Sequence, residues 1–121
     1  MLHLVFCLRR LPHLTREEFQ QYWRGTHAPL VKRHAAALGI HRYVQAHTVA
    51  HPVADGAQAS RGAPEAYDGV AELWFDGDTL IGAMQTPAAL DASRALLDDE
   101  RRFIDLARSP IFFCEDNEVV G

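Results

Sequence analysis

A histidine lies between two residues that disfavour a regular helix, in the segment YWRGTHAPLVKRH at residues 22–34. Gly25 comes shortly before His27, and Pro29 comes shortly after it. A proline at this position has no N–H to donate to the carbonyl of Gly25, and its ring pushes Ala28 away from helical dihedral angles. The segment therefore predicts a helix that kinks or restarts at His27.

An imidazole at a helix restart is suited to proton transfer. The unpaired N–H groups of the restarted helix would carry positive potential, which favours a neutral imidazole able to accept a proton. We therefore expect His27 to act as a general base, or as a hydrogen-bonding anchor, at the mouth of an apolar pocket. The alternative is that His27 only caps a kinked helix.

Five other side chains have types that suit contacts with a small organic substrate. Tyr22 and Trp23 belong to the same helical segment and could form an aromatic pocket wall. Tyr43 and Gln45 lie on one face of an expected strand, and Trp74 lies on another expected strand. We expect these five residues to bind the substrate. The alternative is that the aromatic residues belong to the core and the polar strand residues face water.

The first half of the chain contains a strand and a well-marked helix. Residues 2–8 alternate between two faces with the period of a strand. Thr15 has the position of a helix N-cap, and Glu18 has that of its capping-box partner. From Phe19 an apolar stripe continues at helical spacing until Gly39, a residue type that commonly ends a helix.

The rest of the chain contains three more expected strands. The first of them covers residues 40–49 and the next covers residues 67–75, where side chains alternate again. Between them, residues 50–66 are small, polar and interrupted by proline and glycine, which predicts a long surface loop. The last strand is expected at residues 109–120.

Helical structure is expected between the last two strands. Asp78 and Thr86 have the positions of helix N-caps, and Pro87 suits the first helical position. The acidic run at residues 98–100 falls in the second of these helices, and we interpret it as a solvated helix face.

This order of elements predicts a single α+β domain over residues 1–121. Strand, helix, strand, strand, helix, strand is the order of a ferredoxin-like βαββαβ sandwich, with a four-stranded antiparallel sheet and both helices on one face. The other face would carry apolar side chains from at least three strands, more than a soluble monomer usually exposes. We therefore expect two copies to pack these faces together as a homodimer.

Composition argues against several classes of partner. Sixteen acidic and twelve basic residues give a formal net charge of −4, and no dense Lys/Arg run suggests a nucleic-acid partner. No apolar stretch has membrane-spanning length, and the apolar start lacks the features of a signal peptide. Cys7 and Cys114 lie near opposite ends of the chain, which favours free thiols in a reducing cytoplasm.

No motif predicts a metal or an organic cofactor. The chain has seven histidines, but none of the spacings typical of zinc sites is present. The Walker-type loop, the dinucleotide fingerprint and the G-x-S-x-G motif are also lacking. We therefore expect any chemistry to rely on the side chains of the protein alone.

The segments described above resemble the EthD family of the dimeric α+β barrel superfamily. The most specific part is the motif F-x-x-Y-W-x-x-x-H-A-P-L, which is met by Phe19, Tyr22, Trp23, His27, Ala28, Pro29 and Leu30. The weaker parts, RYVQ, YDGVAELWF and DDERRF, follow in the family's order. The resemblance implies a ferredoxin-like subunit that pairs its sheets into a barrel, with a small-molecule pocket between helix and sheet. Enzymes of that superfamily act on lactones, polyketides, quinols and haem, so the resemblance defines the fold better than the reaction.

Two functional classes follow from these observations. The first is a cofactor-free enzyme of oxidoreductase, oxygenase, isomerase or cyclase type, which acts on a small hydrophobic oxygenated compound with His27 as general base. The second is a non-catalytic accessory module that binds such a compound, or a haem, without converting it. A second titrating group within reach of His27 would favour the enzyme, and a lone histidine in an apolar pocket would favour the binding module.

Overall fold

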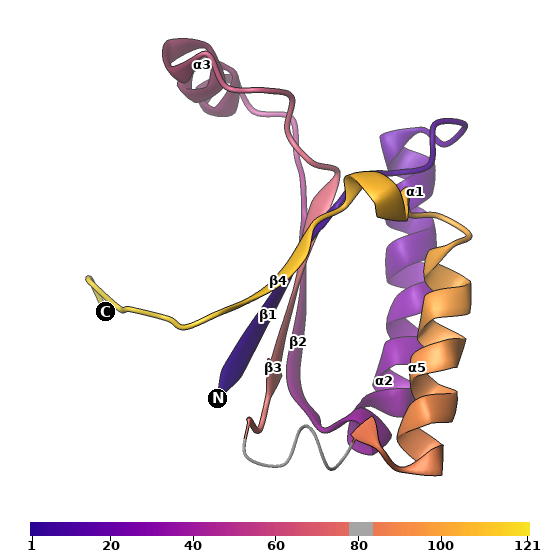
Figure 1. The fold of residues 1–121 in the computed structure, drawn as a ribbon. Helices are drawn as coiled ribbons and strands as arrows, with labels where there is room; N and C mark the ends of the chain where they lie inside the picture. The colour runs from indigo at the N-terminus through magenta and orange to yellow at the C-terminus, as the bar shows by residue number, and fades with distance from the viewer. Residues whose placement is uncertain (78–83) are drawn as a thin grey trace.

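The computed structural model describes residues 1–77 and 84–121, and these residues form one sheet with helices packed against one side of it (Figure 1). The four strands are β1 (Leu2–Leu8), β2 (Ile40–His47), β3 (Gly69–Phe75) and β4 (Ile111–Cys114). Their order in the sheet is β2-β3-β1-β4, and every neighbouring pair is antiparallel. The predicted ferredoxin-like sheet is therefore confirmed. The last strand is shorter than the expected residues 109–120, and the helix expected to begin at Asp78 lies outside the described residues.

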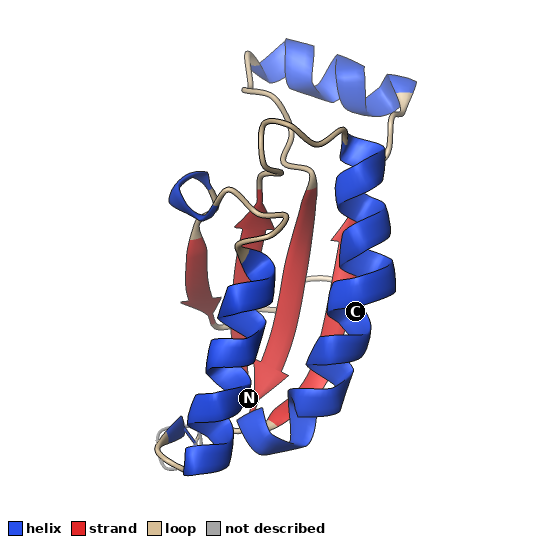
Figure 2. Cartoon of the chain, turned by 90° about the vertical axis from the view of Figure 1, so that its right-hand side faces the viewer, coloured by secondary structure: helices blue, strands red, loops and turns tan. Residues whose placement is uncertain are grey.

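Two long helical columns cover one face of this sheet (Figure 2). The first column consists of α1 (Arg16–Tyr22), a π-helical turn (Trp23–His27) and α2 (Ala28–Leu38). The second is α5 (Pro87–Glu100), which contacts both α2 and the π-helical turn. A short 3₁₀ helix (Leu106–Arg108) leads from α5 towards β4. None of the described helices is long and apolar enough to cross a membrane.

The capping residues of the first column behave as predicted. Thr15 Oγ1 accepts the N–H of Glu18 at 3.1 Å, and Glu18 Oε1 accepts the N–H of Thr15 at 2.9 Å. These two bonds form a complete capping box and satisfy donors that a helix start would otherwise leave unpaired. The column ends at Gly39, whose positive φ of 68° suits a residue without a side chain.

The predicted kink at His27 is wrong. Ala28 keeps helical dihedral angles, and its N–H donates to the carbonyl of Trp23, five residues earlier, so the helix widens into a π-helical turn instead of restarting. This change of hydrogen-bond register accommodates the missing N–H of Pro29 within a continuous column (Figure 1). The His27 side chain makes no capping hydrogen bond, so the structure also contradicts the alternative that it only caps a helix.

The expected loop at residues 50–66 contains a helix, α3 (Pro52–Arg61). His51 caps its start by accepting the N–H of Val53 at 3.1 Å, and Pro52 occupies the first turn. None of the α3 residues is buried, and the helix projects from the sheet on the side away from the two columns (Figure 1). The prediction missed α3 because the helix has no apolar stripe.

The core lies between the helical columns and the sheet. Its largest fully buried side chains include Leu8, Phe19, Trp23 and Phe103. Gly69 in β3 makes room for the indole of Trp23, because a Cβ at position 69 would lie 2.4 Å from Trp23 Cζ3. The same packing that builds the core therefore fixes the π-helical turn against the sheet.

The opposite face of the sheet has a polar centre. His3 is buried there, stacks on Trp74 at 4.3 Å, and places its two ring nitrogens 2.7 Å from Asp116 Oδ1 and 3.1 Å from Glu72 Oε1. Arg42 lies over the other side of the Trp74 indole at 4.6 Å. The strand register places Val5 on the same face as Glu72, so apolar and polar side chains are mixed on this face.

Candidate functional site

His27 and Asp99 form a buried pair between the two helical columns. His27 comes from the π-helical turn, is 5% exposed, and places Nδ1 2.7 Å from Oδ2 of Asp99 in α5. Asp99 is 7% exposed. Because an ionised carboxylate only accepts hydrogen bonds, Nδ1 carries the proton and Nε2 keeps its lone pair.

Tyr22 completes the surroundings of this carboxylate. Its hydroxyl donates to Oδ1 of Asp99 at 2.5 Å, so each oxygen of Asp99 accepts one side-chain hydrogen bond. Burial and the bond to Asp99 raise the pKa of Tyr22, which keeps the hydroxyl protonated as a donor. Tyr22 thus orients Asp99, and it does not line either of the two cavities described below.

The pKa of His27 is lowered from its ordinary value of 6.5. Burial is the main cause, because removing the ring from water disfavours the imidazolium, and the hydrogen bond and charge of Asp99 oppose this effect. At neutral pH, His27 is therefore a neutral imidazole with an unprotonated Nε2. That is the protonation state a general base requires.

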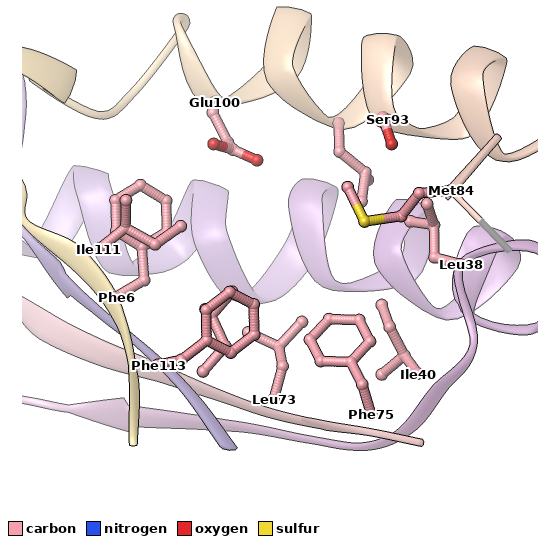
Figure 3. Close-up of a pocket in the computed structure, with 12 residues that line it drawn as sticks. Phe6, Leu38, Ile40, Leu73, Phe75, Met84, Ser93, Glu100, Ile111 and Phe113 are labelled. Carbon is pink, nitrogen blue, oxygen red and sulfur yellow. The ribbon is translucent and has the colours of Figure 1, made fainter. Parts of the chain in front are cut away.

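Two adjoining cavities lie between the helical columns and the sheet. The larger has a volume of about 260 Å³ and an almost wholly apolar lining, with Leu73 and Phe75 on one side and Met84 on another (Figure 3). The smaller, of about 60 Å³, reaches His27. The two cavities share Phe6 and Leu73 among their lining residues, so the histidine lies at the inner end of an apolar space.

Glu100 lines both cavities and supplies a second titrating group. Its carboxyl group points from α5 into the space between helix and sheet (Figure 3). Burial and the neighbouring charge of Asp99 raise the pKa of Glu100 to about 7, against a smaller opposite effect of Arg101. Glu100 can therefore hold or release a proton near neutral pH, next to the base.

The structure brings three of the five predicted binding residues to one place. Trp23 and Tyr43 line the smaller cavity, and Trp23 Nε1 donates to the Tyr43 hydroxyl at 3.2 Å. Gln45 lies behind them and donates from Nε2 to the Tyr43 hydroxyl at 2.9 Å and to the Trp23 carbonyl at 3.0 Å. Gln45 therefore positions Tyr43 and is not part of the cavity wall.

Trp74 is not part of this site. It pairs with His3 and Arg42 across the strands and stacks on the His3 ring, on the face of the sheet that the helices leave open. The prediction placed Trp74 at the pocket because strand periodicity alone does not say which face the helices will cover. The neighbouring residues Leu73 and Phe75 face the cavity instead.

The interpretation of residues 98–100 as a solvated helix face is also wrong for two of the three residues. Asp98 is exposed, whereas Asp99 is buried against His27 and Glu100 lines the cavities. A signal for this lies in the sequence, because one side of α5 continues towards the core at steps of three or four residues through Ala89, Ala92, Leu96, Asp99 and Phe103. A carboxylate in the middle of an apolar stripe indicates a buried polar partner.

The site has no arrangement typical of a metal centre. Within the part of the chain that the structure describes, no three His, Cys, Asp or Glu side chains gather as metal ligands would. The groups that could take part in a reaction are the carboxylate of Asp99, the imidazole of His27, the phenol of Tyr22 and the carboxyl group of Glu100, next to an apolar space.

Solved structures with the same fold cover nearly the whole chain. One is an ethyl tert-butyl ether (EthD) family protein from Bacillus halodurans, with 18% identity and a TM-score of 0.60 over 97% of this chain and 100% of that one. Another is an EthD-like protein from Ralstonia eutropha, with 16% identity and a TM-score of 0.59 over 94% of this chain and 90% of that one. A third is a dimeric protein of unknown function with a ferredoxin-like fold from Bacteroides fragilis, with 9% identity and a TM-score of 0.57 over 95% of each chain.

These similarities establish the fold, since none of the three identities is high enough to transfer an activity. None of the curated proteins matches the chain. The EthD domain family matches residues 11–107, a range that contains the π-helical turn, His27, Asp99 and Glu100. The chain therefore belongs to the EthD family.

Proposed function

We propose that this protein is a cofactor-free enzyme that transfers a proton on a small hydrophobic oxygenated compound, with His27 as the general base. The observation that carries the proposal is the buried pair of His27 and Asp99, which leaves Nε2 of a neutral imidazole free at the end of an apolar cavity. Such a pair holds the ring in one tautomer and stabilises the imidazolium that forms when Nε2 accepts a proton.

Each side chain of the pair has a defined part in this proposal. An apolar substrate would fill the larger cavity and place an acidic C–H or O–H group next to Nε2 of His27. The proton would pass to Nε2, and the positive charge would be balanced by Asp99, which Tyr22 holds in place. The proton would then return to another atom of the substrate, as in an isomerisation or a cyclisation.

Glu100 favours an enzyme over a purely binding module. A module that only holds an apolar ligand needs no second ionisable group inside its cavity, because burying such a group is unfavourable. Glu100 nevertheless lines both cavities, with its pKa raised to about 7. A base with a lowered pKa beside an acid with a raised pKa is the pairing expected of acid–base catalysis.

A homodimer is part of the same proposal. In the described part of the chain, no helix covers the sheet face opposite the site (Figure 1), and this face mixes the half-buried Val5 with the stacked rings of His3 and Trp74. The similar protein from Bacteroides fragilis is dimeric. Pairing of two such faces would bury them, and we propose that two chains assemble in this way in the cytoplasm.

The test is a thermal-shift screen of small ketones, phenols and quinols on the wild type and His27→Ala, followed by turnover assays on every compound that binds. We expect His27→Ala to abolish turnover, or to weaken binding by more than about tenfold, which corresponds to about 1.4 kcal/mol. His13→Ala, at an exposed turn, is the matched control and should leave both unchanged.

Two outcomes would contradict the proposal. If His27→Ala melts several degrees lower yet binds and converts every compound as the wild type does, His27 has only a structural role. If the wild type binds compounds but converts none of them, the protein is the binding module that the sequence left as an alternative.

A further inference from the structure

The hydroxyl of Tyr43 has its oxygen occupied by two donors. Trp23 Nε1 donates to it at 3.2 Å and Gln45 Nε2 donates to it at 2.9 Å. A phenol oxygen has room for about two such bonds, so its own proton must point elsewhere. Tyr43 lines the smaller cavity, and among the described residues no acceptor for its proton is found.

The amide of Gln45 cannot reverse this arrangement, because its orientation is fixed on both sides. Its second N–H donates to the carbonyl of Trp23 at 3.0 Å, and its oxygen lies 2.9 Å from Nε2 of His47. A flipped amide would place its oxygen against the carbonyl oxygen of Trp23, two acceptors facing each other, and would lose the bond to that carbonyl. The amide therefore donates to Tyr43.

His47 and Arg24 set the direction of the bond to Gln45. Arg24 Nη2 lies 3.4 Å from Nδ1 of His47, and a guanidinium group only donates, so Nδ1 accepts and Nε2 carries the proton. Burial, with the charge of Arg24, lowers the pKa of His47 and keeps the ring neutral, as this tautomer requires. Arg24 at the surface thus donates to His47, His47 donates to Gln45, and Gln45 donates to Tyr43. The O–H of Tyr43, the last group in this chain of hydrogen bonds, faces the cavity.

We propose that the Tyr43 hydroxyl binds the carbonyl oxygen of a neutral, enolisable ketone whose neighbouring carbon faces Nε2 of His27. This inference rests on the proposed function and names its substrate class. Among the described residues that line the two cavities there is no lysine or arginine, and Glu100 contributes a carboxyl group to both. An anionic substrate would therefore lack a positive partner there, whereas a neutral carbonyl needs only the one donor that Tyr43 supplies.

The reaction that this geometry supports needs no oxidant or cofactor. Nε2 of His27 takes the proton from the carbon next to the carbonyl, and the electron pair of the broken C–H bond forms a carbon–carbon double bond. The carbonyl π electrons move to the oxygen, where the Tyr43 O–H stabilises the developing negative charge. The imidazolium of His27 then returns the proton to carbon, so that the starting ketone exchanges hydrogen with solvent or its isomer forms.

The binding test compares three probes with similar bicyclic skeletons: β-tetralone, which has a ketone, tetralin, which has no oxygen, and β-naphthoate, which is an anion. Calorimetry on the wild type should show β-tetralone binding about tenfold more tightly than tetralin, with β-naphthoate the weakest. Tyr43→Phe should remove the preference for the ketone. Tyr67→Phe is the matched control, because Tyr67 packs under Arg9 away from the cavities and should keep the preference.

A second variant tests the direction of the donors and not merely the presence of a phenol. Gln45→Glu replaces the amide donor by an acceptor of nearly the same shape, so the Tyr43 proton should turn from the cavity to the new carboxylate. The preference for β-tetralone over tetralin should then disappear although Tyr43 is still present. Circular dichroism verifies that each variant is folded.

Exchange of the ketone's neighbouring hydrogens in D₂O, followed by NMR, separates the two proposals. We expect His27→Ala to stop the exchange while keeping the preference for the ketone, and Tyr43→Phe to lose both. A wild type without a preference for β-tetralone over tetralin, or a Tyr43→Phe variant that keeps it, would overturn the assignment of Tyr43. Wild-type exchange rates in His27→Ala would instead overturn the proposed function and leave the role of Tyr43 standing.

Discussion

At the scale of single residues, the site depends on Asp99. Its two carboxylate oxygens accept from His27 and Tyr22, so the one side chain sets both the tautomer of the base and the position of a donor. Asp99→Asn keeps the shape but removes the charge, and its amide N–H can favour the wrong tautomer of His27. We expect turnover to fall by at least about a hundredfold, measured as kcat on any compound that the wild type converts.

Asp98→Asn is the control for this substitution, because it makes the same change one position earlier in α5. Asp98 is exposed and pairs with Arg101 on the helix surface. A surface pair of this kind contributes little to stability, so this variant should behave as the wild type does. If kcat fell equally in Asp99→Asn and Asp98→Asn, the negative charge of this helix would matter and the hydrogen bond between Asp99 and His27 would not.

Glu100 makes stability depend on pH in a direction opposite to that of most carboxylates. Its pKa rises from 4.5 to about 7 on folding, so the folded state binds the proton more tightly than the unfolded chain does. The folded state gains stability below pH 4.5 and loses that gain as pH rises towards 7. Each unit of pKa difference is worth about 1.4 kcal/mol, so the loss is at most roughly 3 kcal/mol.

Glu100→Gln should remove this dependence. Urea unfolding at about pH 5 and about pH 8 would show the variant gaining stability relative to the wild type as pH rises. His27 gives the opposite slope, because its lowered pKa contributes stability above pH 6.5 that is lost in acid, and this slope is common to both proteins. A variant that loses stability relative to the wild type at the higher pH would contradict the raised pKa of Glu100.

Residue types were more predictable from the sequence than the pairs that they form. The apolar stripe predicted a pocket beside His27, and in the structure His27 is one of the residues that line the smaller cavity. The hydrogen bond between His27 and Asp99 joins two segments that are 72 positions apart in the sequence. Such a contact depends on how α5 is rotated about its axis relative to the π-helical turn. No local pattern specifies that rotation except the apolar stripe that passes through Asp99.

At the scale of the elements, the π-helical turn is held against the sheet by close packing at Gly69. A Cβ on this glycine would lie 2.4 Å from Trp23 Cζ3 and 2.9 Å from the carbonyl oxygen of Ala46, and Trp23 is fully buried. Gly69→Ala must therefore move the indole or the strand, and we expect a loss of about 1–3 kcal/mol in the free energy of unfolding. Chemical unfolding monitored by tryptophan fluorescence measures this loss.

Gly25→Ala is the matched change within the turn itself. Apart from the chain neighbours of Gly25 and the backbone of its own helix, no atom of the described residues lies within 4 Å of the Cβ position of Gly25, and its φ is negative. Alanine therefore fits there and should be neutral or slightly stabilising. A large loss in Gly25→Ala would mean that the turn needs the flexibility of glycine, as the predicted kink had assumed.

The sequence patterns predicted the type of an element better than its hydrogen-bond register. The capping box at Thr15 and the end at Gly39 are local signals, and both are confirmed. A proline inside a helix can be accommodated by a restart or by a π-helical turn. The π-helical turn here is accompanied by the packing of Trp23 over Gly69. This contact joins segments that are distant in sequence, so a local pattern does not predict it. Helix α3 escaped prediction because its local signals, the cap at His51 and Pro52 and the left-handed Gly62 that ends it, enclose small and polar residues without an apolar stripe.

At the scale of the whole molecule, we predict a dimer because the sheet face opposite the helical columns is open. Val5 lies on this face in the central strand β1, half-buried and opposite Glu72 in the register. Val5→Asp would place a charge in the proposed interface, so gel filtration with light scattering should show twice the chain mass for the wild type and the single mass for the variant. Leu90→Asp, on the exposed side of α5, is the control and should remain a dimer.

A wild type that stays monomeric at micromolar concentration would remove the argument for paired sheets. It would leave the site intact, because His27, Asp99 and Glu100 all belong to the helical side of one chain. The assembly and the chemistry are therefore separate claims, and each can fail alone.

The central claim is that His27 is a neutral imidazole with its proton on Nδ1 and its lone pair on Nε2, held by Asp99. Nitrogen-15 NMR of the His27 ring across a pH titration measures both the tautomer and the pKa directly. The account predicts the Nδ1–H tautomer at neutral pH, a pKa below 6.5, and loss of this tautomer preference in Asp99→Asn. An Nε2–H tautomer, or an imidazolium that persists above pH 6.5, would contradict it.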